Sequence, residues 1–329
     1  MRALVTGGAG FLGRYIVEKL LKRGWDVVSL SRNHHPEILT RGVTTIRADI
    51  RDRLLLTDLF EKFDVVFHTA AHVGIYGKYE DFYETNVTGT RNVISACVIN
   101  SVKRLIYTSS PSVTFRGKPE EWADETAPFP KRFNSYYAKT KAIAEWEVRR
   151  NSGRLNMLSC AIRPHLIWGP RDTNLIPRLL ARADEGKLAI VGDGKNLVDM
   201  SYVENVADAH IVAMEELFPG SPAAGSVYLI SQGEPVNLWD WTNKILKRLG
   251  RPPVTKRIPY PLAYAAGAAY EAHHRWNKIY TEPPMTRFLA QQLAMPHYYN
   301  IGKAQRELGF KARISSDEGL ERLAKSLGY

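Results

Sequence analysis

Hydrophobic residues follow two alternating spacings along the first half of the chain. Short apolar runs of strand length, such as 2–7 and 25–31, are followed by stretches whose apolar residues recur every three or four positions. Strand and helix therefore alternate with short connections, which predicts a parallel sheet covered by helices on both faces. The expected strands are 2–7, 25–31, 42–49, 64–71, 102–110 and 155–164, and the expected helices are 11–24, 52–63, 81–100 and 135–150.

The alternation loosens after about residue 170. A helix is expected over 174–186, and 197–217 has the pattern of a strand end that leads into another helix. The last part of the chain is rich in proline, aromatic and basic residues. These patterns predict an α/β protein with a doubly wound parallel sheet (a Rossmann fold of the extended kind) and a smaller, mostly helical C-terminal domain. We expect a dinucleotide-binding domain over 1–168, with 198–230 returning to it, and a substrate domain over 169–197 and 231–329.

Composition narrows the class of protein. The 329 residues are 44% hydrophobic and 24% charged, which is typical of a globular chain. The net charge of +11 is scattered rather than concentrated, so we interpret it as attraction for anionic cofactors and substrates, and we expect no nucleic-acid partner. The chain starts directly with a strand and shows no leader pattern, so we expect a cytoplasmic protein.

Two further features bear on the environment of the protein. The longest apolar stretch, 258–270, is shorter than the roughly 20 residues that span a bilayer. It predicts a buried helix or one wall of an apolar pocket. Cys97 and Cys160 lie in apolar segments without metal-ligand spacing, so they are expected to be reduced core thiols, and no metal site is expected.

A glycine-rich turn stands between the first predicted strand and the first predicted helix. The sequence TGGAGFLG places Gly7, Gly10 and Gly13 in a GxxGxxG pattern, with Phe11 and Leu12 between the last two. In this position the backbone can approach a pyrophosphate, and the helix N-terminus offers free N–H groups. The alternative is a tight turn that binds nothing. The context favours a dinucleotide site.

The end of the second strand indicates which dinucleotide binds. An NAD site usually has an acidic residue there that accepts from the ribose 2′-hydroxyl, but this sequence has no acid before Glu37 and carries Arg32 instead. A guanidinium suits a 2′-phosphate, so we predict NADP(H). A solvated surface arginine is the alternative. Asp49, followed by Ile50, is a candidate contact of the adenine amino group, or a helix N-cap before Arg51.

Three tyrosines are followed by lysine at the fourth position. The pairs are Tyr15/Lys19, Tyr137/Lys141 and Tyr299/Lys303. Only the middle pair lies on a predicted helix that follows the fifth strand of the sheet, so context selects Tyr137 and Lys141. Ser110, at the end of that fifth strand, is the candidate for a second hydrogen-bond donor.

A tyrosine–lysine pair of this kind supports acid–base catalysis. Free tyrosine has a pKa of ~10, and a nearby ammonium together with an oxidised nicotinamide is expected to lower that pKa by roughly 1–3. Tyr137 would then give a proton to a carbonyl oxygen as hydride arrives, or take it back in the reverse reaction. The alternative is a solvated helix face.

The chain resembles the extended short-chain dehydrogenase/reductases over essentially its whole length. The phrases TGGAGFLG, HTAA, ETNVTGT, YTSSPSV, YYAKTK and RPHLIWGP occur in that family's order. Within the family the chain resembles the 3β-hydroxysteroid dehydrogenase branch, and in that branch the 2-alkyl-3-oxoalkanoate reductases of bacterial long-chain olefin biosynthesis, through phrases such as IVGDGKNLVDMSYVEN and EPPMTRFLAQQL. The resemblance implies that Asn86 is structural and that the cofactor site includes Ala70, Ala71, Lys141, Pro164 and His165.

The substrate is less well defined by the residues themselves. Aromatic residues in loops near the strand ends suit a long alkyl chain or a steroid, although each one is also plausible as a core residue. The candidate substrate contacts are His72, Tyr76, Trp168 and Arg171.

The resemblance implies NADPH-linked reduction of a hydrophobic 2-alkyl-3-ketoalkanoic acid. The alternatives are a 3β-hydroxysteroid or sterol-4-carboxylate dehydrogenase, a nucleotide-sugar epimerase or dehydratase, and a non-catalytic NADP-sensing or nucleic-acid-binding protein. The family resemblance also suggests a homodimer and association with other olefin-pathway enzymes.

Overall fold

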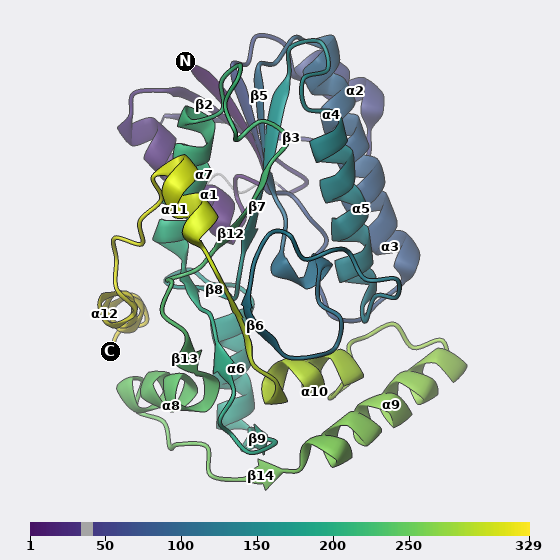
Figure 1. Ribbon diagram of the computed structural model, residues 1–329, viewed down its shortest axis with the longest axis vertical. Coiled ribbons are helices and arrows are strands. Elements are labelled where there is room, and N and C mark those ends of the chain that lie inside the picture. The colour runs from purple at the N-terminus through teal and green to yellow at the C-terminus, as the bar shows by residue number, and fades with distance from the viewer. Residues whose placement is uncertain (34–41) are drawn as a thin grey trace.

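A seven-stranded parallel sheet forms the centre of the computed structural model, which describes residues 1–33 and 42–329 (Figure 1). The strand order is β12-β7-β5-β4-β1-β2-β3, so the chain starts near the middle and winds outward in both directions. The predicted doubly wound sheet is confirmed. Its strands are β1 (Arg2–Thr6), β2 (Asp26–Ser31), β3 (Val43–Arg47), β4 (Val65–His68), β5 (Arg104–Thr108), β7 (Leu158–Pro164) and β12 (Val227–Ile230).

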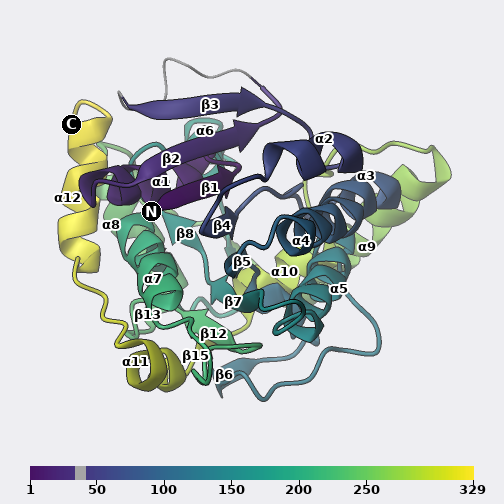
Figure 2. The same cartoon turned by 90° about the horizontal axis from the view of Figure 1, so that it is seen from above.

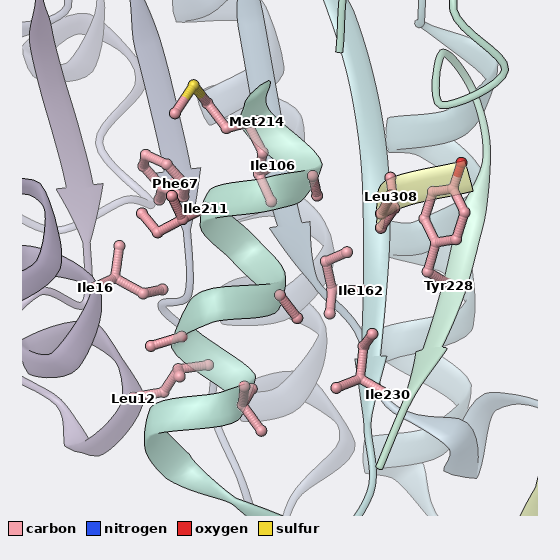
Figure 3. Close-up of a cluster of buried hydrophobic side chains, with 14 of the residues drawn as sticks. Leu12, Ile16, Phe67, Ile106, Ile162, Ile211, Met214, Tyr228, Ile230 and Leu308 are labelled. Carbon is pink, nitrogen blue, oxygen red and sulfur yellow. The ribbon is translucent and has the colours of Figure 1, made fainter. Parts of the chain in front are cut away.

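Helices cover both faces of this sheet. One layer contains α1 (Phe11–Lys22) and α7 (Val203–Glu215), and the other contains α2 (Arg53–Leu59), α4 (Gly89–Ile99) and α5 (Tyr136–Arg150) (Figure 2). Successive side chains of a strand enter different cores: Ile106 of β5 packs beneath α7 (Figure 3), whereas Leu105 and Tyr107 pack on the opposite side. Burial on both faces explains why the inner strands are mostly apolar, whereas the edge strand β3 is only partly buried.

The helix predicted over 81–100 is interrupted. It consists of α3 (Tyr79–Tyr83), a π-helical turn η2 (Glu84–Thr88) and α4. Asn86 lies in the π turn, where its side chain accepts from the backbone N–H of His72 at 2.7 Å and donates to Thr140 Oγ1 at 3.1 Å. The irregular turn thus fixes the loop that follows β4.

The tail adds a second sheet and most of the remaining helices. The order of that sheet is β13-β10-β15-β6, so the segment between β5 and α5 pairs with a strand near the C-terminus. The helices are α6 (Leu175–Asp184), α8 (Leu238–Arg248), α9 (Tyr260–Trp276), α10 (Arg287–Ala294), α11 (Gly302–Leu308) and α12 (Ser316–Ser326), and a short 3₁₀ turn, η3, covers Pro111–Val113. The strands are β6 (Glu120–Ala123), β10 (Leu197–Val198), β13 (Val236–Asn237) and β15 (His297–Tyr299), with the pairs β8 (Ile167–Trp168)/β11 (Ser201–Tyr202) and β9 (Ile190–Val191)/β14 (Arg257–Ile258).

Most of the apolar stretch 258–270 lies in the helix α9, but the expectation that this helix is buried was wrong. In α9 only Ala263, Gly267 and His274 are buried. The helix packs mainly on α10, and a Cβ at Gly267 would lie 2.6 Å from the carbonyl carbon of Thr286. One helical neighbour covers one face only, and the other face is left exposed. Among the described residues, no helix is long and apolar enough to cross a bilayer.

The prediction for the two cysteines is confirmed. Cys97 and Cys160 are buried and form no disulfide. Burial raises the pKa of the Cys160 thiol to about 12, so the thiol stays protonated at neutral pH.

Candidate active site

The glycine turn forms a cradle that side chains would fill. Gly7 has a φ of +72°, and a Cβ at Gly13 would lie 2.1 Å from the carbonyl oxygen of Gly7. Gly10 is the N-cap residue of α1, and it offers no side-chain cap to the first-turn N–H groups. A pyrophosphate fits this combination of close backbone approach and free donors. Phe11 and Leu12 begin α1 at the same point.

The loop after β4 lies beside this cradle. A Cβ at Gly7 would lie 2.9 Å from the backbone nitrogen of Ala70. The structure therefore brings Ala70 and its neighbour Ala71 next to the turn, where the resemblance implied a cofactor contact. Their role in binding stays a prediction.

Arg32 is exposed directly after β2, as expected for a side chain at the rim of the sheet. The carboxylate of Asp49 is bound by the Arg51 guanidinium, which lowers the pKa of Asp49, and the charge of Arg32 lies near enough to lower it further. The N-cap alternative for Asp49 was wrong, because Asp52 caps α2 by accepting from Leu55 N–H at 3.1 Å. Ile50 is buried, 2.6 Å from where a Cβ on Gly89 would stand. Glu37 lies outside the described residues.

The three predicted catalytic residues come together at the carboxyl end of β5. Ser135 caps α5 by accepting from Ala138 N–H at 3.1 Å, so Tyr137 lies in the first turn of that helix. Lys141 is buried one turn later, where its Nζ donates to Thr108 O and lies 4.1 Å from the centroid of the Tyr107 ring.

Ser110 follows β5, and its side chain forms a hydrogen bond with the Tyr137 side chain. Its Oγ lies 3.0 Å from Ser112 Oγ, and the hydrogen bond with Ser110 moderates the pKa of the Tyr137 phenol. A hydroxyl, a phenol and an ammonium thus share one corner of the sheet.

The pKa of Tyr137 differs from the expectation. Burial raises it to about 12, and the hydrogen bond with Ser110 offsets only part of that effect. Burial lowers the pKa of Lys141 to about 7, against the opposing charge of Glu145. The lysine donates to Thr108 rather than to the phenol, so the protein alone does not lower the pKa of Tyr137. At neutral pH this residue is a protonated phenol and is able to act as a proton donor.

A buried ion pair that the sequence analysis missed lies behind these residues. Arg163 of β7 donates to both carboxylate oxygens of Glu145, at 2.8 and 2.6 Å, and Ser109 Oγ donates to the same carboxylate at 2.7 Å. Both charged side chains are nearly inaccessible to solvent. The pair ties α5 to β7 and to the loop that carries Ser110. Its sequence signal was a glutamate four residues after Lys141, on the same helix face.

The two competing tyrosine–lysine pairs have other partners. Tyr15 donates to Pro170 O at 2.8 Å, and Lys19 forms an ion pair with Asp208. Tyr299 donates to Glu120 at 3.0 Å from β15, whereas Lys303 lies in α11. The last two residues therefore do not share a helix face.

Pro164 ends β7, and His165 follows it in a buried histidine pair. His297 Nε2 must donate to the carbonyl oxygen of Gln292, 2.9 Å away, because a carbonyl only accepts. His297 Nδ1 is then an acceptor, so His165 Nε2 donates to it at 2.7 Å. Burial lowers the pKa of both imidazoles, which leaves this pair neutral.

The four candidate substrate contacts separate into two groups. His72 and Tyr76 lie in the loop after β4, and the ring of Tyr76 meets that of His274 of α9 with centroids 5.6 Å apart. Trp168 is completely buried against Tyr202 and Trp241, so it is a core residue rather than a substrate contact.

Arg171 also differs from the prediction. Its guanidinium forms an ion pair with Glu18 of α1 at 2.5 Å and lies over the ring of Tyr15. This arginine already has a carboxylate partner within the chain, so it does not support a substrate-carboxylate role.

Comparison with known proteins identifies the family of the chain. The model of the 3-beta hydroxysteroid dehydrogenase/isomerase family matches residues 4–262. The chain belongs to this family. The chain is an oxidoreductase that acts on hydroxyl or keto groups, in keeping with the names of its relatives.

Two bacterial relatives carry the same name. The chain is 44% identical over 329 residues to a 2-alkyl-3-oxoalkanoate reductase of Stenotrophomonas maltophilia, covering 99% of both chains. It is 42% identical to a protein of the same name from Shewanella oneidensis, covering 99% of this chain and 86% of that one. A 3beta-hydroxysteroid-dehydrogenase/decarboxylase of Arabidopsis thaliana is 35% identical over 351 residues, with 99% and 79% covered.

Solved structures share the fold. MoeE5 in complex with UDP-glucose and NAD is 26% identical, with a TM-score of 0.78 and coverage of 100% of this chain and 99% of that one. An epimerase of Methanothermobacter thermautotrophicus has a TM-score of 0.80 at 22% identity, covering 99% and 92%, and shows the fold alone.

Proposed function

We propose that this enzyme reduces a 2-alkyl-3-ketoalkanoic acid to the 2-alkyl-3-hydroxyalkanoic acid with NADPH. The carrying observation is the convergence of Tyr137, Ser110 and Lys141 at the carboxyl end of β5, next to the loop that approaches the glycine cradle. The names of the two bacterial relatives supply the substrate class.

NADPH, when bound, supplies a hydride that forms a C–H bond at C3 of the keto acid. Tyr137 donates its proton to the carbonyl oxygen, which becomes the 3-hydroxyl, and its high pKa keeps the phenol protonated until charge develops. Ser110 donates a second hydrogen bond to that oxygen. Lys141, whose pKa burial lowers to about 7, stabilises the phenolate that remains when it is itself protonated, and the Arg163–Glu145 pair holds the supporting strand and helix in place.

Arg32 supports NADPH over NADH. A guanidinium at the end of β2 binds a 2′-phosphate with charge-assisted hydrogen bonds, which typically stabilise by about 1.5–3 kcal/mol. Arg32→Asp should raise the KM for NADPH roughly 10- to 100-fold and leave the KM for NADH little changed. An unchanged KM for NADPH would refute the cofactor assignment.

A spectrophotometric assay of NADPH and NADP+ tests the reaction itself. It would compare a 2-alkyl-3-hydroxy acid, a 3β-hydroxysteroid and a UDP-sugar as substrates for the oxidative direction, with Tyr137→Phe as the control. Turnover confined to the hydroxy acid supports the proposal. Turnover of the UDP-sugar alone would exclude it.

A sterol or steroid 3-dehydrogenase is the second candidate. Relatives at 33–35% identity include a mouse sterol-4-alpha-carboxylate 3-dehydrogenase and the Arabidopsis enzyme named above. A 3-dehydrogenase oxidises a 3-hydroxyl group to a ketone, which is the reverse of the reduction proposed above. Turnover of the 3β-hydroxysteroid in the assay therefore distinguishes a steroid dehydrogenase from a keto-acid reductase.

The remaining features of the proposal concern organisation. We propose that residues 1–168 and 198–230 bind the cofactor, and that 169–197 and 231–329 bind the hydrophobic substrate. The enzyme would work in the cytoplasm as a homodimer through helices of the dinucleotide-binding domain, alongside other enzymes of olefin biosynthesis.

A further inference from the structure

The outward face of α9 carries a continuous apolar surface. Its exposed residues recur at spacings of three and four, which places them on one side of the helix. Leu262 and Trp276, at the two ends, are 62% and 88% exposed. In Figure 1 this helix lies at the periphery of the molecule, beyond α10. We name this surface the outer stripe; it consists of Leu262, Ala265, Ala269, Ala272 and Trp276.

Positive charge borders both ends of the outer stripe. Lys256 and Arg257 precede α9, Arg275 and Lys278 stand at its C-terminal end, and all four are exposed. Within the described ranges, none of these four forms an ion pair. Glu271 is the one acidic residue in the stretch 252–281.

That carboxylate is already neutralised. Arg287 pairs with Glu271 at 2.7 Å, and the glutamate side chain is mostly buried. Residues 252–281 therefore present apolar and cationic groups to the solvent without an exposed carboxylate of their own, while the exposed Asp193 contacts Arg257 through its backbone oxygen.

We propose that the outer stripe of α9 docks this protein on an anionic lipid surface. A helix with an exposed apolar face and flanking Lys and Arg residues lies in the headgroup region, where it buries apolar area and attracts anionic lipids. Trp276, Tyr270 and Tyr280 are exposed aromatic residues of the type that occupies this interface.

Charge selects the lipid surface over a second copy of the chain. A twofold pairing of two outer stripes brings the same patch against itself. Antiparallel α9 helices would set Arg275 and Lys278 of one copy beside Lys256 and Arg257 of the other. Like charges in contact disfavour that association.

The helix that carries the outer stripe also contacts the loop after β4, which holds the candidate substrate contacts His72 and Tyr76. The C-terminal end of α9 meets the loop after β4 through the rings of His274 and Tyr76, and Lys78 Nζ lies 4.7 Å from the Tyr280 ring centroid. Delivery of an alkyl keto acid from the bilayer would follow, and that consequence rests on the proposed function. The docking itself does not.

Sedimentation with vesicles tests the docking. The full chain should bind phosphatidylcholine vesicles that contain phosphatidylglycerol, bind vesicles of phosphatidylcholine alone weakly, and dissociate at high salt. Trp276→Ser should lower the partition coefficient at least about tenfold. Arg275→Glu combined with Lys278→Glu should abolish the preference for phosphatidylglycerol. The matched control is Trp122→Ser, since Trp122 is 58% exposed on β6 and should leave binding unchanged.

Three results would overturn the proposal: no binding to phosphatidylglycerol vesicles, equal loss of binding in Trp122→Ser and Trp276→Ser, or a smaller mass of Trp276→Ser than of the wild type in light scattering. The last result would mean that a second copy occupies the stripe. Vesicle binding requires no turnover, so a failed reductase assay leaves this result intact.

Discussion

The central seven-stranded sheet with its covering helices (the sheet half) and the part that carries the second sheet and α9 (the tail) are stabilised in different ways. In the sheet half, α7 lies on the sheet with nine buried residues, and the charged pair Arg163–Glu145 is enclosed. In the tail, α9 buries three residues, and ion pairs such as Arg251–Asp184 are exposed to solvent. The groups proposed for proton transfer thus lie in the half that encloses the charged pair. In the half proposed for substrate binding, α9 buries few residues, and a segment of this kind opens locally at a lower free energy.

Tyr137→Phe tests whether the sheet half performs the chemistry. We expect kcat to fall about 10²- to 10⁴-fold, because the proton donor is lost while the ring remains. Tyr136→Phe is the matched control, since that neighbouring side chain is 50% exposed. Steady-state kinetics would measure both variants. A Tyr137→Phe enzyme with nearly normal kcat would remove the catalytic role from this half.

Removal of one carboxylate in each half tests the difference in stabilisation directly. Glu145→Ala leaves Arg163 charged and buried, which should lower the free energy of unfolding by about 3–5 kcal/mol. Asp184→Ala breaks an exposed pair and should leave the free energy of unfolding nearly unchanged. Urea denaturation measures both. Equal losses would show that the two halves do not differ in this respect.

Gly267→Ala perturbs the tail alone. The added Cβ would meet the backbone of Thr286 and Arg287 at 2.6 and 2.7 Å, so α9 must move away from α10. Overpacking of this kind costs about 1–3 kcal/mol, part of which the better helix propensity of alanine offsets. Hydrogen exchange should increase in α9 and α10 but not in the central sheet. Ala269→Leu adds volume on the exposed side and should show no such increase.

Lys141→Met gives a pH-dependent signature. The folded pKa of about 7 lies below the ordinary value of 10.5, so between these pH values the unfolded chain binds a proton that the folded chain does not. Stability of the wild type should therefore gain up to about 1.4 kcal/mol per pH unit from this group as pH rises through that window. The variant should lose that gain. Parallel stability curves for the two proteins would contradict the low pKa.

The hydrophobic pattern predicts the two halves unequally, for a physical reason. Strands buried on both faces, such as β4, are apolar apart from single polar residues like His68, and that signal is local. The burial of α9 depends on what packs against it, which periodicity does not encode. The same limit applies to the site. Tyr137 and Lys141 are neighbours on one helix, so their spacing is visible in the sequence.

Long-range contacts account for the errors. The Arg163–Glu145 pair joins residues of different elements, and glutamate in a helix is usually solvated, so the spacing of Lys141 and Glu145 on one helix face is the only local signal and does not identify the arginine partner. Trp168 resembled a pocket aromatic because its loop follows a strand end, yet Tyr202 and Trp241 enclose it. The pKa of Tyr137 was misjudged because the pattern predicts a neighbouring lysine but not the complete burial of the phenol, which raises the pKa.

The pairing of β6 with β15 has a consequence for synthesis on the ribosome. The strand β6 lies between Ser110 and Tyr137 in the sequence. Its pairing partner is β15 (His297–Tyr299), which is translated far later. The segment between the two proposed catalytic residues therefore lacks its partner strand until almost the whole polypeptide has emerged. A nascent chain would assemble most of the central sheet early and would acquire its completed reaction centre only near the end of translation.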